Sequence, residues 1–189
     1  MRRLTVFNSI SLDGYFTDAS GGMNWAYNSH PDPAWDAFVE GNAKGDGYLL
    51  FGRITYDLMA SYWPTPAAKQ QLPVVAERMN TTEKVVFSRS MKQASWNNTN
   101  IISNDIVSEL RSMKRDAKKD MVILGSGSIV AQLAAAQLID EYQFVVIPVV
   151  LGGGRTMFDG IKNRLKLQFI DSRVFANGNV FLRYKPAGQ

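Results

Sequence analysis

Glycine and hydroxyl residues gather at two places where a predicted strand is followed by a predicted helix. Residues 51–55 read Phe-Gly-Arg-Ile-Thr, and residues 124–128 read Leu-Gly-Ser-Gly-Ser. Glycine lets backbone approach a ligand closely, and the free N–H groups at the positive end of a helix attract an anion. Two such junctions suit a pyrophosphate, although for a Gly-x-Gly alone the simpler interpretation is a tight turn. Val130 stands where the usual dinucleotide fingerprint has its third glycine, so a dinucleotide would have to bind in another way.

The residue inventory excludes several kinds of chemistry. The chain has no cysteine and one histidine, His30, which excludes disulfide scaffolds, thiolate zinc sites, iron–sulfur clusters, cysteine nucleophiles and multi-histidine metal sites. We therefore expect no metal. Lys and Arg outnumber Asp and Glu by 21 to 17, but they are spread along the chain, and Asp116 and Asp120 interrupt the densest basic group. This spacing favours a solvated helix end over a nucleic-acid surface, and it leaves anionic small molecules open as ligands.

Strand and helix patterns alternate along the chain, with a glycine-rich loop at residues 13–31. Asp32 can cap a helix whose first position is Pro33. Asn177-Gly178, between two β-rich segments, is a strong hairpin signal. We predict an α/β fold whose sheet is mostly parallel and ends in an antiparallel hairpin. The predicted strands cover residues 4–10, 48–51, 84–88, 121–124 and 142–151, and the predicted helices cover residues 32–41, 53–61, 66–79 with a break at Pro73, 106–113 and 129–138.

Length and composition predict one globular domain over residues 1–189, because 46% of the residues are apolar or aromatic. No apolar stretch reaches about 18 residues, and no apolar signal region follows Arg2 and Arg3. We therefore expect a cytoplasmic protein with no membrane partner. The late strand at 142–151 is more apolar than one solvated face allows, which favours a homodimer, whereas Pro148 argues against a central place in the sheet.

Five short motifs follow one another along nearly the whole chain. They are Ser-Leu-Asp-Gly at 11–14, Gly-Arg-Ile-Thr-Tyr at 52–56, Phe-Ser-Arg at 87–89, Gly-Ser-Gly at 125–127, and Asp-Glu at 140–141 leading to Pro-Val-Val-Leu-Gly-Gly-Gly at 148–154. In this order they resemble the dihydrofolate-reductase superfamily, and more closely its branch related to the riboflavin-biosynthesis reductase domain. The resemblance implies a dihydrofolate-reductase-like three-layer fold with a mixed, mainly parallel central sheet. That fold agrees with the pattern of predicted strands and helices.

The resemblance implies NADPH as the cofactor. It places Arg53 at the ribose 2′-phosphate, with Ser88 and Arg89 bordering the same phosphate, and it places Thr55 and the loop at 125–128 at the pyrophosphate. A phosphate dianion suits a guanidinium fork, whereas a merely solvated arginine would be unfavourable beside a positive helix end. The residues that the resemblance assigns to the cofactor are Gly14, Gly52, Arg53, Thr55, Ser88, Arg89, Gly125, Ser126, Gly127 and Ser128.

Two carboxylates are the candidates for catalysis on the substrate side. By resemblance, Asp13 belongs to the segment that lines the nicotinamide, and Asp36 matches the position where folate-reducing members bind the pteridine. A buried Asp36 could hold a protonated ring nitrogen and assist proton delivery. The alternative is an exposed first-turn carboxylate that only gains from the helix dipole. His30, Trp25 and Trp35 are candidates for the pocket wall.

The expected function is an NADPH-dependent reductase that passes a hydride to an imine or carbonyl of a small pterin-, pyrimidine- or ribose-derived substrate. Two alternatives stay open. One is a true dihydrofolate reductase, and the other is a non-catalytic nucleotide-binding domain that has kept the cofactor cleft.

Overall fold

Ten strands and six α-helices make up the part of the chain that the computed structural model describes, residues 1–27 and 30–188. The strands are β1 (Leu4–Ser11), β2 (Tyr15–Thr17), β3 (Tyr48–Gly52), β4 (Lys84–Phe87), β5 (Thr99–Ile102), β6 (Met121–Leu124), β7 (Glu141–Ile147), β8 (Arg155–Thr156), β9 (Leu167–Val174) and β10 (Val180–Pro186). The helices are α1 (Pro33–Ala43), α2 (Arg53–Tyr62), α3 (Pro66–Gln71), α4 (Pro73–Thr81), α5 (Ile106–Asp116) and α6 (Gly127–Ala135), with a 3₁₀ turn at Asn24–Ala26.

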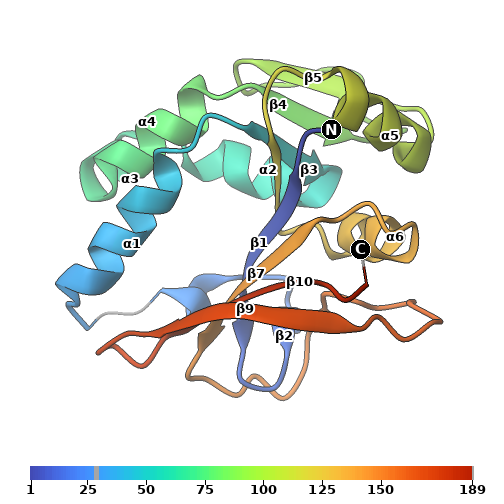
Figure 1. Ribbon diagram of the computed structural model, residues 1–189. Coiled ribbons are helices and arrows are strands. Elements are labelled where there is room, and N and C mark those ends of the chain that lie inside the picture. Colours follow the sequence, from blue (N-terminus) through green and yellow to red (C-terminus); the bar gives the residue numbers. More distant parts are fainter. Residues whose placement is uncertain (28–29, 189) are drawn as a thin grey trace.

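Eight strands form one mixed sheet in the order β5-β4-β3-β6-β1-β7-β10-β9, and β2 pairs with β8 in a separate ribbon (Figure 1). The strands from β5 to β7 are all parallel, whereas β10 runs antiparallel to both β7 and β9. The turn that joins β9 to β10 contains Asn177 and Gly178, and the φ of Gly178 is +88°. The predicted mostly parallel sheet with a C-terminal antiparallel hairpin is confirmed.

The strand predicted over residues 142–151 is shorter in the structure. β7 ends at Ile147 because Pro148 has no N–H with which to continue the ladder. β7 also lies between β1 and β10, and Val145 and Ile147 are buried within the chain. Its apolar content therefore reflects burial inside the protein and gives no argument for a partner.

Other boundaries follow the prediction unevenly. The start of α1 is as expected, because the Asp32 carboxylate accepts hydrogen bonds from the N–H groups of Ala34 and Trp35 at 2.9 and 3.1 Å. α6 covers Gly127–Ala135 rather than residues 129–138. The sequence did not predict β5, β2 or β8; β5 has polar residues at two of its four positions, and the other two strands have three and two residues.

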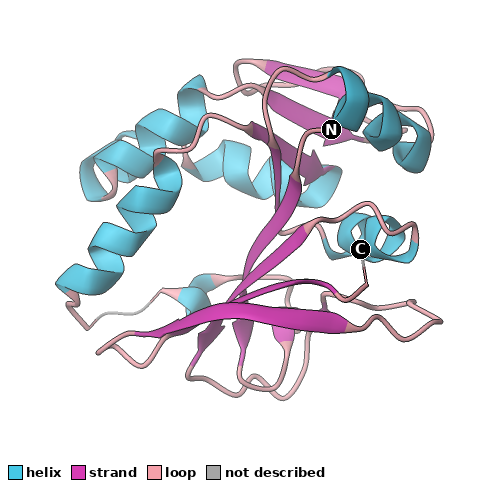
Figure 2. Ribbon diagram, viewed as in Figure 1, coloured by secondary structure: helices cyan, strands magenta, loops and turns pink. Residues whose placement is uncertain are grey.

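Helices cover both faces of the sheet, as Figure 2 shows. On one face, α5 and α6 pack through Leu110, Val130 and Leu133 against strand residues such as Leu4 and Ile123. On the other face, α1, α2 and α4 cover two further apolar clusters. This is the three-layer arrangement that the resemblance implies. No helix within residues 1–27 and 30–188 is both long and apolar enough to cross a bilayer.

Candidate functional site

The ends of neighbouring parallel strands bring the predicted cofactor residues to one edge of the sheet. Gly52 at the end of β3 lies opposite Phe87 at the end of β4, so Arg53 and Ser88 follow paired positions. On the other side of β3, Leu50 pairs with Ile123 of β6. We call this region, where β3, β4, β6 and β1 end, the carboxyl edge. It is the edge at which open α/β sheets usually bind ligands.

Hydrogen bonds join the two glycine-containing junctions directly. The N–H of Gly52 donates to Ser126 Oγ at 2.9 Å, and the N–H of Ser126 donates to Thr55 Oγ1 at 3.0 Å. Ser126 adopts a left-handed conformation with φ of +62°, and its hydroxyl donates to the carbonyl of Leu124. The sequence suggested that the N–H groups of the two junctions are free for an anion, but the protein's own side chains accept from those of Gly52 and Ser126.

Two helices that start at the carboxyl edge nevertheless have first-turn N–H groups without a side-chain cap. Side chains of Asp32, Thr65 and Asp105 cap α1, α3 and α5. No side chain caps α2, which follows Gly52, or α6, which follows Ser126. α4 also lacks such a cap, but it begins at Pro73 directly after α3. First-turn N–H groups have no partner within their helix, so two adjoining helix starts present donors and positive dipole ends.

Asn8 fixes the second junction from the central strand, and sequence reasoning missed it. Its side-chain oxygen accepts from the N–H of Gly125 at 2.5 Å, and its amide nitrogen donates to the Gly125 carbonyl at 3.3 Å. Asn8 is buried within β1. An amide in a central strand is a signal that could have found it, because asparagine is depleted in strands and needs partners when buried.

Packing alone requires glycine at two positions of this junction. The φ of Gly125 is +59°, and a Cβ there would lie 2.7 Å from Thr55 Cγ2. A Cβ at Gly127 would lie 2.7 Å from the Phe16 ring, because the β2–β8 ribbon packs against the start of α6. The tight-turn interpretation is therefore sufficient for both glycines, and the case for a ligand rests on the uncapped helix starts.

Basic side chains lie near the ends of β3 and β4. Arg53 forms an ion pair with Asp57 at 3.1 Å, and both side chains are about half exposed, at 49% and 52%. Arg89 is exposed and, after the hydrogen bonds from Ser108, helps to lower the pKa of Asp105. Ser88 lies beside Arg89, and its hydroxyl accepts from the N–H of Met91 at 3.0 Å. Arg53 and Ser88 thus follow paired strand positions, and the side chains of Arg53 and Arg89 are both exposed.

Asp13 ties the loop after β1 to the loop after β7. Its carboxylate accepts from the Ser11 hydroxyl at 2.7 Å and from the N–H groups of Leu151 and Gly152 at 3.1 and 2.8 Å. These hydrogen bonds, that from Ser11 foremost, lower the pKa of Asp13 from 3.8 to about 2. Asp13 is therefore ionised at neutral pH, which suits a structural clamp better than a proton donor. Gly14, with φ of +87°, follows it in the turn.

The second candidate carboxylate, Asp36, is exposed in the first turn of α1. Trp35 of the same helix turns inward, with its ring 5.1 Å from that of Phe175. Trp25 packs in the same apolar cluster, whereas His30 is exposed. The structure therefore puts both tryptophans against the sheet and leaves Asp36 facing water.

A surface hollow lies at the other end of the strands. It has a volume of about 710 Å³ and includes Tyr48 and Thr99, the first residues of β3 and β5, together with the second half of α5. Its lining includes none of the residues predicted for the cofactor or for catalysis. Within the described part of the chain, no group of three or more His, Cys, Asp or Glu side chains could hold a metal ion.

Comparisons with known proteins agree with this architecture. The family model of the RibD C-terminal domain matches residues 2–181. Uncharacterized protein YyaP of Bacillus subtilis (strain 168) is 27% identical over 183 residues, which cover 97% of this chain and 94% of that protein.

Two solved structures show the same fold at low identity. A Shewanella sp. PV-4 protein named for riboflavin biosynthesis superposes with a TM-score of 0.76 at 22% identity, over 97% of this chain and 98% of that one. The dihydrofolate reductase of Enterococcus faecalis, complexed with NADP(H) and RAB-propyl, has a TM-score of 0.63 at 14% identity, over 98% and 96% of the two chains.

Proposed function

The chain belongs to the RibD C-terminal domain family, and from this membership and the carboxyl edge we propose that it is an NADPH-dependent reductase. The reaction is hydride transfer to an imine or carbonyl carbon of a small pterin-, pyrimidine- or ribose-derived substrate. The observation that carries the proposal is the pair of adjoining helix starts, α2 and α6, without side-chain caps and joined through Ser126. Such a pair is suited to a pyrophosphate.

The residues at the carboxyl edge fit the cofactor chemically. Arg53, Ser88 and Arg89 would hold the 2′-phosphate, since guanidinium groups bind phosphate through paired charged hydrogen bonds. The first turns of α2 and α6 would hold the pyrophosphate, with Thr55 and Ser126 fixing the two turns relative to each other. NADPH, when bound, supplies the hydride, and the protein supplies orientation and electrostatics.

On the substrate side, the two carboxylates have different tasks in this proposal. Asp13 positions the loops after β1 and β7, because its oxygens accept from Ser11 and from two backbone N–H groups. Asp36 stays the candidate for holding a protonated ring nitrogen or guiding a proton on the resemblance alone, because its exposure is what the helix-dipole alternative expects.

The deciding experiment follows NADPH oxidation by absorbance with three additions: dihydrofolate, 5-amino-6-(5-phosphoribosylamino)uracil, and buffer alone. The proposal predicts oxidation that depends on an added substrate of the pterin, pyrimidine or ribose type. Fast turnover with dihydrofolate, together with tight antifolate binding, would identify a true dihydrofolate reductase. NADPH binding without oxidation across a panel of such substrates would support the non-catalytic alternative, and absence of NADPH binding would refute both.

A further inference from the structure

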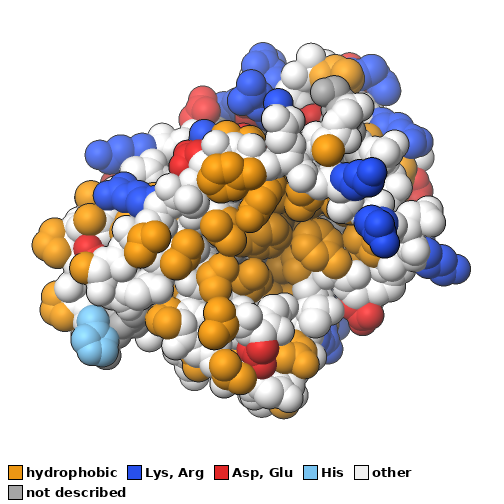
Figure 3. All heavy atoms as spheres, turned by 60° about the horizontal axis from the view of Figure 1, so that its bottom comes forward, with side chains coloured by type: hydrophobic (Ala, Val, Ile, Leu, Met, Phe, Trp, Pro, Cys, Tyr) orange, Lys and Arg blue, Asp and Glu red, His pale blue; other side chains and the backbone are white. Residues whose placement is uncertain are grey.

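Exposed apolar side chains gather on the elements that leave the carboxyl edge. Apart from Met1 and three residues of β9, the large apolar side chains that are exposed within residues 1–27 and 30–188 follow β1 or β7, precede α1 or stand on α2. They are Leu12, Val150, Tyr27, Ile54 and Leu58. On the underside of the molecule, Figure 3 also shows hydrophobic side chains gathered in a hollow, with Lys and Arg at its margin or beyond. Exposed apolar groups that lie together often mark a ligand-binding surface.

The two flanks of α2 differ in charge. Thr55 faces β6, because its hydroxyl oxygen accepts from the N–H of Ser126, which lies just after that strand. Residues three or four apart share one side of a helix, so Leu58 and Tyr62 lie on the same flank as Thr55. We call Leu58 and Tyr62, together with Ile54 one turn before Leu58, the apolar flank.

The charged side chains of α2 lie on its other flank. Arg53 and Asp57, one helical turn apart, form the ion pair described above. Each is two residues from Thr55, which is about 200° around a helix with 3.6 residues per turn. Arg53 and Asp57 therefore face away from β6 and toward β4, where Ser88 follows the strand position that pairs with Gly52. The proposed function uses this side for the cofactor phosphate, which leaves the apolar flank for the substrate.

Tyr27 brings the segment before α1 close to the apolar flank. Partial burial, and then the neighbouring Tyr62, raise the pKa of Tyr27, so the two hydroxyl groups lie near each other. Tyr62 is held in place, because its hydroxyl donates to Gln71 Oε1 at 2.9 Å. α1, which begins after this segment, contains no Lys or Arg and carries the exposed carboxylates of Asp36 and Glu40. The elements around the apolar flank therefore supply aliphatic, tyrosine and acidic side chains.

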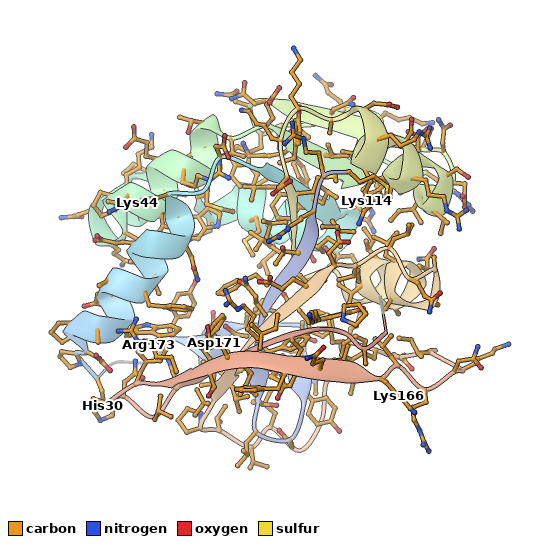
Figure 4. All side chains as sticks on the ribbon, in the orientation of Figure 1. His30, Lys44, Lys114, Lys166, Asp171 and Arg173 are labelled. Atoms are coloured by element: carbon orange, nitrogen blue, oxygen red, sulfur yellow. The ribbon has the colours of Figure 1, made fainter. Side chains whose placement is uncertain are left out.

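Two basic side chains near α1 lie away from the apolar flank. Lys44 follows the last turn of α1, at the end opposite its start, as Figure 4 shows. Arg173, on β9, lies over the Phe175 ring at 4.8 Å, and that ring packs 5.1 Å from the ring of Trp35 in α1. Because β10, β7, β1 and β6 separate β9 from β3, α1 stands between Arg173 and α2.

The apolar flank has consequences for the charge of the substrate. A phosphate or carboxylate held against it would lose water without gaining a positive partner, which is costly. Ionised Asp13, at the end of β1, and exposed Asp36 add negative charge near the same edge. Taking the proposed function as its basis, we propose that the substrate is a flat, neutral or protonated heterocycle without phosphate or carboxylate, whose ring lies against the apolar flank. Within the proposed class, this selects the unphosphorylated pyrimidines and the pterins without an anionic tail.

The first test compares matched compounds that differ only in their anionic groups. One pair is 5-amino-6-(5-phosphoribosylamino)uracil and the same compound without its phosphate, and the other pair is dihydrofolate and its dimethyl ester. Calorimetry in the presence of NADP⁺ should show that the uncharged member of a pair binds at least about tenfold more tightly. Tighter binding of an anionic member, or binding of none of the four compounds, would overturn the inference.

NADPH oxidation, measured with the same four compounds, separates this inference from the proposed function. Preferred binding of the uncharged members together with their oxidation supports both. Preferred binding without any oxidation supports the inference and contradicts the proposed reaction. Oxidation of the anionic members, with their tighter binding, supports the reaction and contradicts the inference.

The second test places a basic group on the apolar flank. Leu58 is 42% exposed, so Leu58→Arg should fold, which circular dichroism checks. The new guanidinium should shift the binding preference toward the anionic member of a pair by about tenfold. The matched control is Asn100→Arg, which adds the same charge at an exposed position in the far edge strand β5 and should leave the preference unchanged. Equal shifts in the two variants, or no shift in Leu58→Arg, would contradict contact between the substrate and the apolar flank.

Discussion

Replacing Gly125 by alanine tests whether the carboxyl edge is built as the structure shows. The new Cβ would lie 2.7 Å from Thr55 Cγ2 and 3.0 Å from Thr55 Oγ1, at a φ of +59°. The left-handed conformation costs alanine about 1–2 kcal/mol. Moving Thr55 aside would also break its hydrogen bond from Ser126, a loss of about 0.5–1.5 kcal/mol. We expect Gly125→Ala to lower the free energy of unfolding by about 1.5–3.5 kcal/mol.

Gly160→Ala is the matched control. Gly160 also has a positive φ, +82°, but no atom lies within 4 Å of the position that its Cβ would take. It should therefore show the backbone cost alone, about 1–2 kcal/mol. Urea unfolding of both variants measures the two free energies on the same scale.

A second substitution isolates the contact with Thr55. Thr55→Ser removes Cγ2, the atom closest to the new Cβ, and keeps the hydroxyl that accepts from Ser126. In a double-mutant cycle, Thr55→Ser should recover part of the stability lost in Gly125→Ala. Equal losses of unfolding free energy in Gly125→Ala and Gly160→Ala, with no coupling to Thr55, would refute the close contact between Gly125 and Thr55.

Three further predictions concern ionisable side chains. Asp36→Asn should retain NADPH binding and lower turnover by about 10²-fold. Unchanged turnover would show that Asp36 only interacts favourably with the dipole of α1. Asp13→Asn should lose less stability than wild type between pH 4 and 2, measured by circular dichroism. Ionised Asp13 stabilises the fold above its usual pKa of 3.8, and this stabilisation is lost as pH falls through its folded pKa of about 2. Burial, and then Arg78, lower the pKa of Lys84 from 10.5 to about 8. Between pH 8 and 10.5 the unfolded chain therefore keeps the Lys84 proton that the folded chain has lost. The free energy of unfolding of wild type should rise relative to that of Lys84→Met over this pH range. A constant difference between the two free energies, measured by urea unfolding, would contradict this.

The sequence predicted the elements with strong local signals. Asp32 and Pro33 define the start of α1 because capping is a contact between near neighbours in the chain. Asn177-Gly178 marks the last hairpin for a similar reason. β5 escaped prediction because only two of its four residues are apolar, whereas β4 and β6, also of four residues, have three and four; the end of β7 was misplaced because apolar residues continue past Pro148.

The sequence predicted that the glycine-containing junctions lie at one edge of the sheet, but it did not predict the hydrogen bonds between them. Parallel strands bring their ends to one edge, so the positions of Gly52 and Gly125 follow from the strand prediction. Which N–H groups stay available depends on contacts between distant residues, such as Ser126 with Thr55 or Asn8 with Gly125. Sequence spacing holds no information about such pairs. The hydrogen bonds that keep Asp13 ionised could not be predicted either, because one donor, the N–H of Gly152, is distant from Asp13 in the sequence.

The measurement that tests the central claim most directly is calorimetric titration of wild type and Arg53→Ala with NADPH and with NADH. We predict that wild type binds NADPH more tightly than NADH. Arg53→Ala should weaken NADPH binding by about 1.5–3 kcal/mol, the range for a charged hydrogen bond, and leave NADH binding nearly unchanged. Failure of wild type to bind NADPH, or equal losses for the two cofactors, would contradict the placement of the 2′-phosphate at Arg53.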